Sequence, residues 1–101
     1  MLEITESQGI IYSLKHCKMA GLNTNIKRKQ VDYHVQTEDK GQGINHVETI
    51  IYKSGRVLSS RKSSYESLIN QPDLKQKIQQ IINKQHEECL KEINDGKFDP
   101  I

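Results

Sequence analysis

Two segments of strand-forming residues meet at Ser54-Gly55, a pair that is typical of a two-residue hairpin turn. The segments run from His46 to Lys53 and from Arg56 to about Lys62, so we expect them to pair as antiparallel strands. A two-residue loop also fixes the register and places Lys53 opposite Arg56. Because side chains alternate between the two faces of a strand, the hairpin predicts which residues share a face.

Further signals extend this hairpin into a small α+β domain. Apolar and polar residues alternate from Val31 to Glu38, as in a strand with one buried face, and Thr24 to Arg28 predicts a strand before it. Apolar residues then recur at helical spacing from Pro72 to about Asn94, and Gly96 ends that pattern. The predicted fold is a small antiparallel sheet of three to four strands, a meander, packed on one face by a C-terminal α-helix.

The length and the composition suit one domain with one modest core. The chain has 101 residues, of which 34% are hydrophobic. We assign residues 23–101 to the α+β domain and residues 1–22 to an N-terminal arm or extra element. That element contains an apolar cluster, Ile10 to Leu14, which fits a strand, a short helix or an arm that packs elsewhere.

The hairpin register separates the sheet into two faces of different composition. Continued along both strands, it places Ile51 opposite Leu58. One face then collects the apolar side chains, and the helix needs such a partner for its own apolar stripe. The side chains expected beneath the helix are Val31, Tyr33, Val35, Val47, Ile51 and Leu58.

The opposite face of the predicted sheet is mostly polar but carries a small apolar patch. The same register places Glu48 opposite Arg61, which predicts a cross-strand ion pair. An apolar patch with a polar rim often marks a contact site. The expected interaction face consists of His34, Glu48, Ile50, Tyr52, Val57 and Arg61. Three outcomes are open: the Ile10–Leu14 cluster folds back over this patch, a partner or second copy of the chain covers it, or the patch stays exposed.

Charge, cysteines and hydropathy narrow the function classes. The 15 basic and 13 acidic residues leave a net charge of +2, too balanced to imply a polyanionic partner by itself. Cys17 and Cys89 form neither a CxxC pair nor a disulfide framework. The acidic start has no apolar signal core, and no apolar run reaches the roughly 20 residues of a membrane span. We therefore expect a cytoplasmic protein that does not enter a membrane.

Two groups of residues have the chemistry of a metal or acid–base site, but neither spacing is specific. His34, Glu38, His46 and Glu48 fall on the predicted open face, where a solvated polar surface is the favoured interpretation. His86 and Cys89 lie three residues apart on the helix, and His16-Cys17 would complete four zinc ligands. Cys89, however, falls within the apolar stripe, which favours a core cysteine. We expect no cofactor, no metal and no catalytic residue.

Nucleic-acid binding is the main alternative function. Basic residues lie on or near adjacent strands, and Tyr33 or Tyr52 could stack on bases. The residues in question are Lys27, Arg28, Lys29, Lys53, Arg56 and Lys62. Acidic residues on the same face, including Asp32 and Glu48, oppose this interpretation, because a nucleic-acid interface needs a strong basic footprint.

Three features together resemble small bacterial domains that have no assigned function. They are the strand Tyr33-His-Val-Gln-Thr-Glu-Asp39, the hairpin Ser54-Gly55-Arg-Val57, and Gln85-His86 on a helix. The resemblance spans roughly residues 24–98. It implies a bacterial, cytoplasmic origin and carries no catalytic assignment.

Taken together, the sequence favours a non-enzymatic protein–protein interaction or regulatory module, with a homodimer as one form. The two-sided apolar pattern of residues 46–58 is the observation behind this hypothesis. Weak nucleic-acid binding through the basic strands is the alternative. A metal or acid–base site on the open face is a second alternative.

Overall fold

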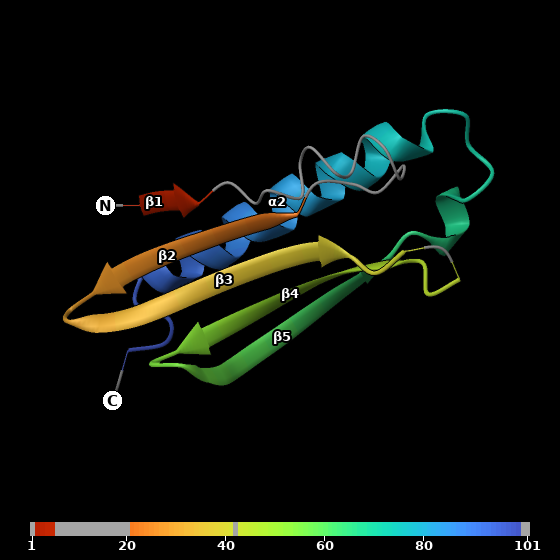
Figure 1. Cartoon of the computed structure of the whole chain (residues 1–101). Coiled ribbons are helices and arrows are strands. Elements are labelled where there is room, and N and C mark those ends of the chain that lie inside the picture. Colours follow the sequence, from red (N-terminus) through yellow and green to blue (C-terminus); the bar gives the residue numbers. More distant parts are fainter. Residues whose placement is uncertain (1, 6–20, 42, 100–101) are drawn as a thin grey trace.

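In a computed structural model, which describes residues 2–5, 21–41 and 43–99, the chain folds into an antiparallel sheet and one long helix. Figure 1 shows the strands side by side in sequence order, with the helix along one face of the sheet. The elements are β1 (Leu2–Thr5), β2 (Leu22–Arg28), β3 (Val31–Asp39), β4 (His46–Lys53), β5 (Arg56–Ser64), the 3-10 helix η1 (Glu66–Leu68) and α2 (Leu74–Asn94).

The predicted fold class is confirmed: strands β2 to β5 form an antiparallel meander packed against the C-terminal helix. Strand β1 adds to this meander by pairing with β2, with Glu3 opposite Asn25. The apolar cluster Ile10 to Leu14 lies outside the described residues, as do His16 and Cys17. The division into residues 1–22 and 23–101 stays a prediction.

Two tight turns lie at the same end of the sheet. Lys29 and Gln30 join β2 to β3, and Ser54 and Gly55 join β4 to β5. All four residues have positive φ, from 50° at Lys29 to 83° at Gly55. Turns with two such residues have the twist that suits antiparallel strands, which explains why both hairpins form with two-residue loops.

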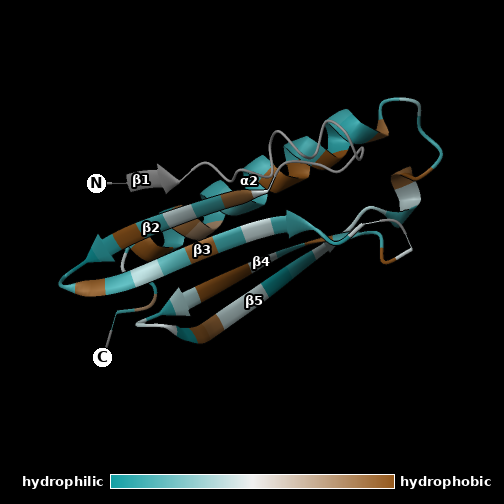
Figure 2. Cartoon of the chain, viewed as in Figure 1, coloured by the Kyte–Doolittle hydropathy of each residue, from teal (hydrophilic) through white to brown (hydrophobic). Residues whose placement is uncertain are grey.

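Helix α2 begins two residues later than expected and ends where expected. Pro72 lies in the turn before the helix, and Asp73 occupies the N-cap position without a side-chain cap. The last helical residue is Asn94, and Gly96 follows with a φ of 86°. Brown and teal bands alternate along α2 in Figure 2, as expected for a helix with one apolar stripe.

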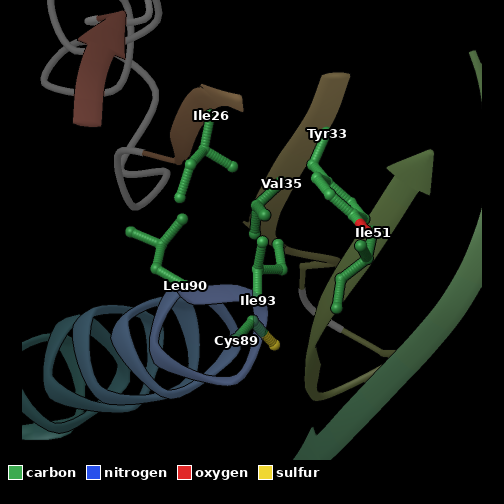
Figure 3. Close-up of a cluster of buried hydrophobic side chains, with 7 residues drawn as sticks. All are labelled: Ile26, Tyr33, Val35, Ile51, Cys89, Leu90 and Ile93. Carbon is green, nitrogen blue, oxygen red and sulfur yellow. The ribbon is translucent and has the colours of Figure 1, made fainter. Parts of the chain in front are cut away.

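The apolar side chains between sheet and helix form two clusters. In Figure 3, residues of β2, β3 and β4 point toward Cys89, Leu90 and Ile93 of α2. A second cluster, towards the helix N-terminus, comprises Val47, Tyr65, Ile78 and Ile82. The first comprises Ile26, Tyr33, Val35, Ile51, Cys89, Leu90 and Ile93.

A buried polar band lies between sheet and helix along with these clusters. The imidazole of His86 lies 2.7 Å from Thr24 Oγ1 through Nε2 and 2.7 Å from Thr37 Oγ1 through Nδ1. Both threonines are fully buried and His86 is 3% exposed. Burial and, as a smaller effect, the charge of His34 lower the pKa of His86 from 6.5 to about 4, so the ring is neutral near pH 7.

The band continues from His86 across β4 to β5. Thr37 and Thr49 share a 2.7 Å hydrogen bond between their hydroxyls. The amide of Gln85 donates to Thr49 Oγ1 at 2.9 Å and accepts a hydrogen bond from the Ser63 hydroxyl. Within the described residues, no buried side-chain nitrogen or oxygen lacks a partner. The polar groups of the interior are therefore paired with one another, as burial requires.

The predicted register of the second hairpin is correct at its start and wrong beyond it. Tyr52 lies opposite Val57, but Ile51 lies opposite Ser59 instead of Leu58. Leu58 is the extra residue of a β-bulge and is 39% exposed. A bulge shifts the alternation by one residue, so every side chain after it in β5 changes face.

The last described residues contact β2 and β4 at the end of the sheet where the two tight turns lie. The guanidinium of Arg28 donates two 2.9 Å hydrogen bonds to the carboxylate of Asp99 and one to Asn94 O. This pairing lowers the pKa of Asp99 to about 2. Gly96 has a φ of 86°, which favours glycine, and a Cβ at this position would lie 2.8 Å from the Arg28 guanidinium, so the arginine would have to move.

Candidate interaction surface

The open face is the face of β2 to β5 that points away from α2, and two of its rows of side chains cross all four strands. The first, which we name the histidine row, contains one residue from each strand: Asn25, His34, Tyr52 and Val57. The second, the glutamine row, consists of Asn23, Gln36, Ile50 and Ser60. Neither row contains an acidic or a permanently charged basic residue.

Charged side chains border these two rows on both sides. Beyond the glutamine row lies the glutamate row, in which Glu48 is flanked by Glu38 and Lys62. Beyond the histidine row, Lys27 Nζ lies 3.4 Å from Asp32. The open face thus has an uncharged centre and a charged rim, which is the arrangement typical of protein interfaces.

His34 is held in the centre of the histidine row. Its Nδ1 lies 2.6 Å from Asn25 Oδ1 and its Nε2 lies 3.2 Å from Asn23 Oδ1. On its other side, the ring lies 5.9 Å from the ring of Tyr52, at an interplanar angle of 49°. Contacts from both neighbouring strands fix the imidazole, so the row presents a defined surface rather than mobile side chains.

The apolar residues of the open face lie on the two strands farthest from β2. Ile50 and Tyr52 of β4 are half-buried, and Val57 of β5 is 64% exposed. A hollow of about 360 Å³ lies beside Tyr52, lined by residues that also include His34 and Gln36. Among the described residues, no helix or loop packs on Ile50 and Tyr52 to complete their burial.

The predicted position of Arg61 is wrong because of the β-bulge at Leu58. Arg61 lies on the helix side of β5, where its guanidinium contacts both carboxylate oxygens of Glu92 at 2.7 and 3.2 Å. This contact lowers the pKa of Glu92 and raises that of Arg61. The predicted Glu48–Arg61 ion pair therefore does not form. Lys62 faces Glu48 instead, and Lys40 Nζ lies 3.7 Å from the Glu48 carboxylate.

The predicted metal candidates on the open face are not brought together. His34 is engaged by the two asparagines of β2, whereas Glu38 and Glu48 lie further along the strands and share Lys40. Lys40 is 3.1 Å from Glu38, and its pKa is raised by that hydrogen bond. No group of three or more His, Cys, Asp or Glu side chains in residues 2–5, 21–41 and 43–99 could hold a metal ion.

His86 and Cys89, the helical zinc candidates, belong to the interior. Both imidazole nitrogens of His86 are engaged by threonine hydroxyls. The thiol of Cys89 is fully buried within the first apolar cluster, and burial raises its pKa. A protonated, buried thiol is a poor metal ligand and a weak nucleophile.

Most of the basic residues proposed for nucleic-acid binding contact oxygens of the chain itself. Asp99 binds Arg28 and lies 3.3 Å from Lys29 Nζ, while Lys53 donates to Phe98 O at 3.3 Å. Lys27 pairs with Asp32. In the part of the chain that the structure describes, Arg56 and Lys62 are the members of this set without such a contact. The basic footprint is therefore small.

Three residues that the sequence reasoning missed complete the open face. Asn23, Asn25 and Ser60 became part of it through the register of β2 and the shift in β5. The alternation of β3 and the predicted β2–β3 pairing could have indicated the asparagines, because they lie opposite Gln36 and His34. Ser60 had no such signal, since its face depends on the bulge.

No family model, curated protein or solved structure matches this chain. The resemblance of residues 24–98 to small bacterial domains remains an expectation. Within the described residues, no helix is long and apolar enough to cross a membrane.

Proposed function

We propose that the chain is a non-enzymatic interaction module that binds a protein partner through the open face of its sheet. The uncharged centre formed by the histidine and glutamine rows carries this proposal. Ile50, Tyr52 and Val57 supply apolar contact area there, and His34 and Gln36 supply hydrogen-bonding groups. Aromatic side chains and the absence of charge are features of the buried centre of an interface.

The charged rim supports the same function in a different way. Glu38, Glu48 and Lys62 remain accessible to water when the centre is covered, so they add specificity at little desolvation cost. Arg61, which the sequence suggested for this role, binds Glu92 instead. We place the module in the cytoplasm, on the basis of its two cysteines without a disulfide pattern.

Site-specific photo-crosslinking tests this proposal in the full chain. A benzophenone amino acid at Val57 is expected to give a covalent adduct with a protein in cells, because this position lies on the open face. The same group at Gln76, an exposed residue of α2, is the matched control. The adduct should disappear when Ile50 is replaced by lysine. Equal labelling from both positions, or none from position 57, contradicts the proposal.

Single-stranded nucleic acid is the second candidate partner, favoured by one observation. Lys62 lies on the open face, as Tyr52 does, and has no carboxylate partner within salt-bridge distance among the described residues; Arg56, at the start of β5, lies in the row of Lys53 and Tyr33 on the helix side. Stacking on Tyr52 would then be combined with one cationic contact, from Lys62. Fluorescence anisotropy with mixed oligonucleotides at low salt tests it. Binding should fall steeply with salt and in Lys62→Ala, and no change in anisotropy at low salt excludes this candidate.

A further inference from the structure

The open face is complementary to itself. The polar members of its two central rows are asparagine, glutamine, histidine, serine and tyrosine. Each of these side chains both donates and accepts hydrogen bonds, so each can pair with the same residue type on another molecule. A face of one charge would instead repel its own copy and require a partner of opposite charge.

The rim is balanced in the same way. The basic side chains around the centre are Lys27, Lys40 and Lys62, and the acidic ones are Asp32, Glu38 and Glu48. Lys27 and Lys40 already form ion pairs with this acidic set. Two copies placed face to face therefore bring no excess of like charge together.

The β5 edge of the sheet offers a less suitable contact between two copies of the chain. The charged residues of β5 are Arg56, Arg61 and Lys62, all of them basic. Pairing two β5 strands would bring like charges together, and the bulge at Leu58 interrupts the row of backbone groups that such pairing needs. This observation favours the face over the edge.

The area of the open face predicts a weak contact rather than a permanent one. Four strands about 4.8 Å apart, with a rise of about 3.3 Å per residue, give a face of roughly 500 Å². Two such faces would bury roughly 1,000 Å², which is the lower limit for a specific interface. A contact of this size belongs to the class of weak, transient interfaces.

We propose that the partner of the open face is a second copy of this chain, bound face to face around a two-fold axis that lies between the two faces, runs parallel to the strands and passes between Gln36 and Ile50. This inference rests on the proposed function and names its partner. The isologous geometry places each central row against central rows of the other copy and leaves the charged rims at the periphery. Gln36, at the middle of the sheet, then lies near its own counterpart.

Sedimentation velocity from low to several hundred micromolar protein tests this inference. The wild-type chain should shift from monomer to dimer mass, whereas Gln36→Lys should stay monomeric, because it brings two ammonium groups together near the axis. Gln76→Lys on α2 is the control and should dimerise like the wild type. A wild-type chain that remains monomeric, or a Gln36→Lys variant that still dimerises, overturns the inference.

Charge complementation keeps the test independent of folding. An equal mixture of Gln36→Lys and Gln36→Glu should recover the dimer mass that neither variant shows alone, which misfolded variants could not produce. If the mixture stays monomeric while the wild type dimerises, the axis lies elsewhere and the inference is wrong. The crosslink at Val57 separates the two proposals: an adduct of twice the chain mass supports the second copy. An adduct with a different protein refutes the second copy and retains the interaction module.

Discussion

The two faces of the sheet carry similar polar side chains, but those facing the helix are buried and those on the open face are accessible to water. Each face has a histidine held by two hydrogen-bonding neighbours: His86 lies between two threonines beneath the sheet, and His34 contacts two asparagines above it. Only the inner histidine is buried, and that burial lowers the pKa of His86 to about 4. Burial therefore decides whether the same polar chemistry serves stability or remains available for binding.

The largest expected difference in stability between the two faces is between substitutions of the neighbouring residues Ile50 and Ile51 of β4. Ile51→Ala should lower the free energy of unfolding by about 3–4 kcal/mol, because Ile51 is 1% exposed and its truncation leaves a cavity. Ile50→Ala should cost less than about 1 kcal/mol, since Ile50 on the open face is already in contact with water. Urea unfolding at low protein concentration, where the chain is monomeric, measures both. Equal losses would mean that something covers the open face within the monomer.

The pH dependence of stability should come from the inner histidine. The pKa of His86 is about 4 in the folded chain and 6.5 in the unfolded one, so the unfolded chain takes up the proton first. Stability is then complete above about pH 6.5 and falls by about 3 kcal/mol as the pH approaches 4. His86→Gln should largely remove this slope, because a neutral amide can donate and accept without titrating.

His34→Gln is the matched control on the open face and should leave that slope in place. Urea titrations at several pH values between 7 and 4 give the free energies. A slope that disappears in His34→Gln and persists in His86→Gln would reverse our assignment of the two histidines. As the pH falls from about 4 to about 2, the stability contributed by the Arg28–Asp99 contact is lost as well, because the pKa of Asp99 is lowered to about 2 in the folded chain.

Removing a hydroxyl group should likewise cost more stability on the helix side of the sheet than on the open face. Thr37→Val keeps the shape of the side chain but leaves His86 Nδ1 without a buried partner and leaves the Thr49 hydroxyl with only its bond from Gln85, so we expect a loss of about 2 kcal/mol. Ser60→Ala on the open face should change stability by less than about 0.5 kcal/mol. Thermal or urea unfolding decides; a loss at Thr37 no larger than at Ser60 would show that the polar band adds no stability.

The smallest expected difference in stability is between substitutions of Arg61 and Lys62, and it tests which residues of β5 lie on each face. Arg61→Ala removes the contact with Glu92 and should cost about 1 kcal/mol, whereas Lys62→Ala on the open face should cost less than about 0.5 kcal/mol. The Arg61 effect should weaken at high salt, because the pair is partly exposed to solvent. If Lys62→Ala were the more costly change, the two residues would lie on the opposite faces from those described.

The open face was predictable from the sequence only where apolar residues marked the register. In β3, the buried residues Tyr33 and Val35 alternate with polar ones, so a shift by one residue would expose the core. In β4, both faces carry apolar residues, and the Ser54-Gly55 turn fixed the register instead. The sequence of β5 after Leu58 is Ser-Ser-Arg-Lys-Ser-Ser, in which neither phase is apolar. Its register is therefore weakly specified by the local pattern, and the strict alternation that we assumed placed Arg61 on the wrong face.

The inner polar band escaped sequence reasoning for a different reason. Threonine on a strand and glutamine or histidine on a helix are ordinary surface residues, and nothing in their spacing indicates burial. Gln85 and His86 become interior residues because the threonine hydroxyls of three strands satisfy them. The hydrogen-bond partner of His86 on β2 is 62 residues away along the chain.

Local chemistry alone indicated strands β2 to β5, the Ser54-Gly55 turn and the helix of this chain. Hydrophobic periodicity and turn residues act over a few positions and can be recognised without knowing the fold. The tertiary structure decided the bulge at Leu58, the pairing of Arg61 with Glu92 and the burial of His86. These features depend on side chains that meet only when the helix packs on the sheet, so their free energy does not exist in any isolated segment.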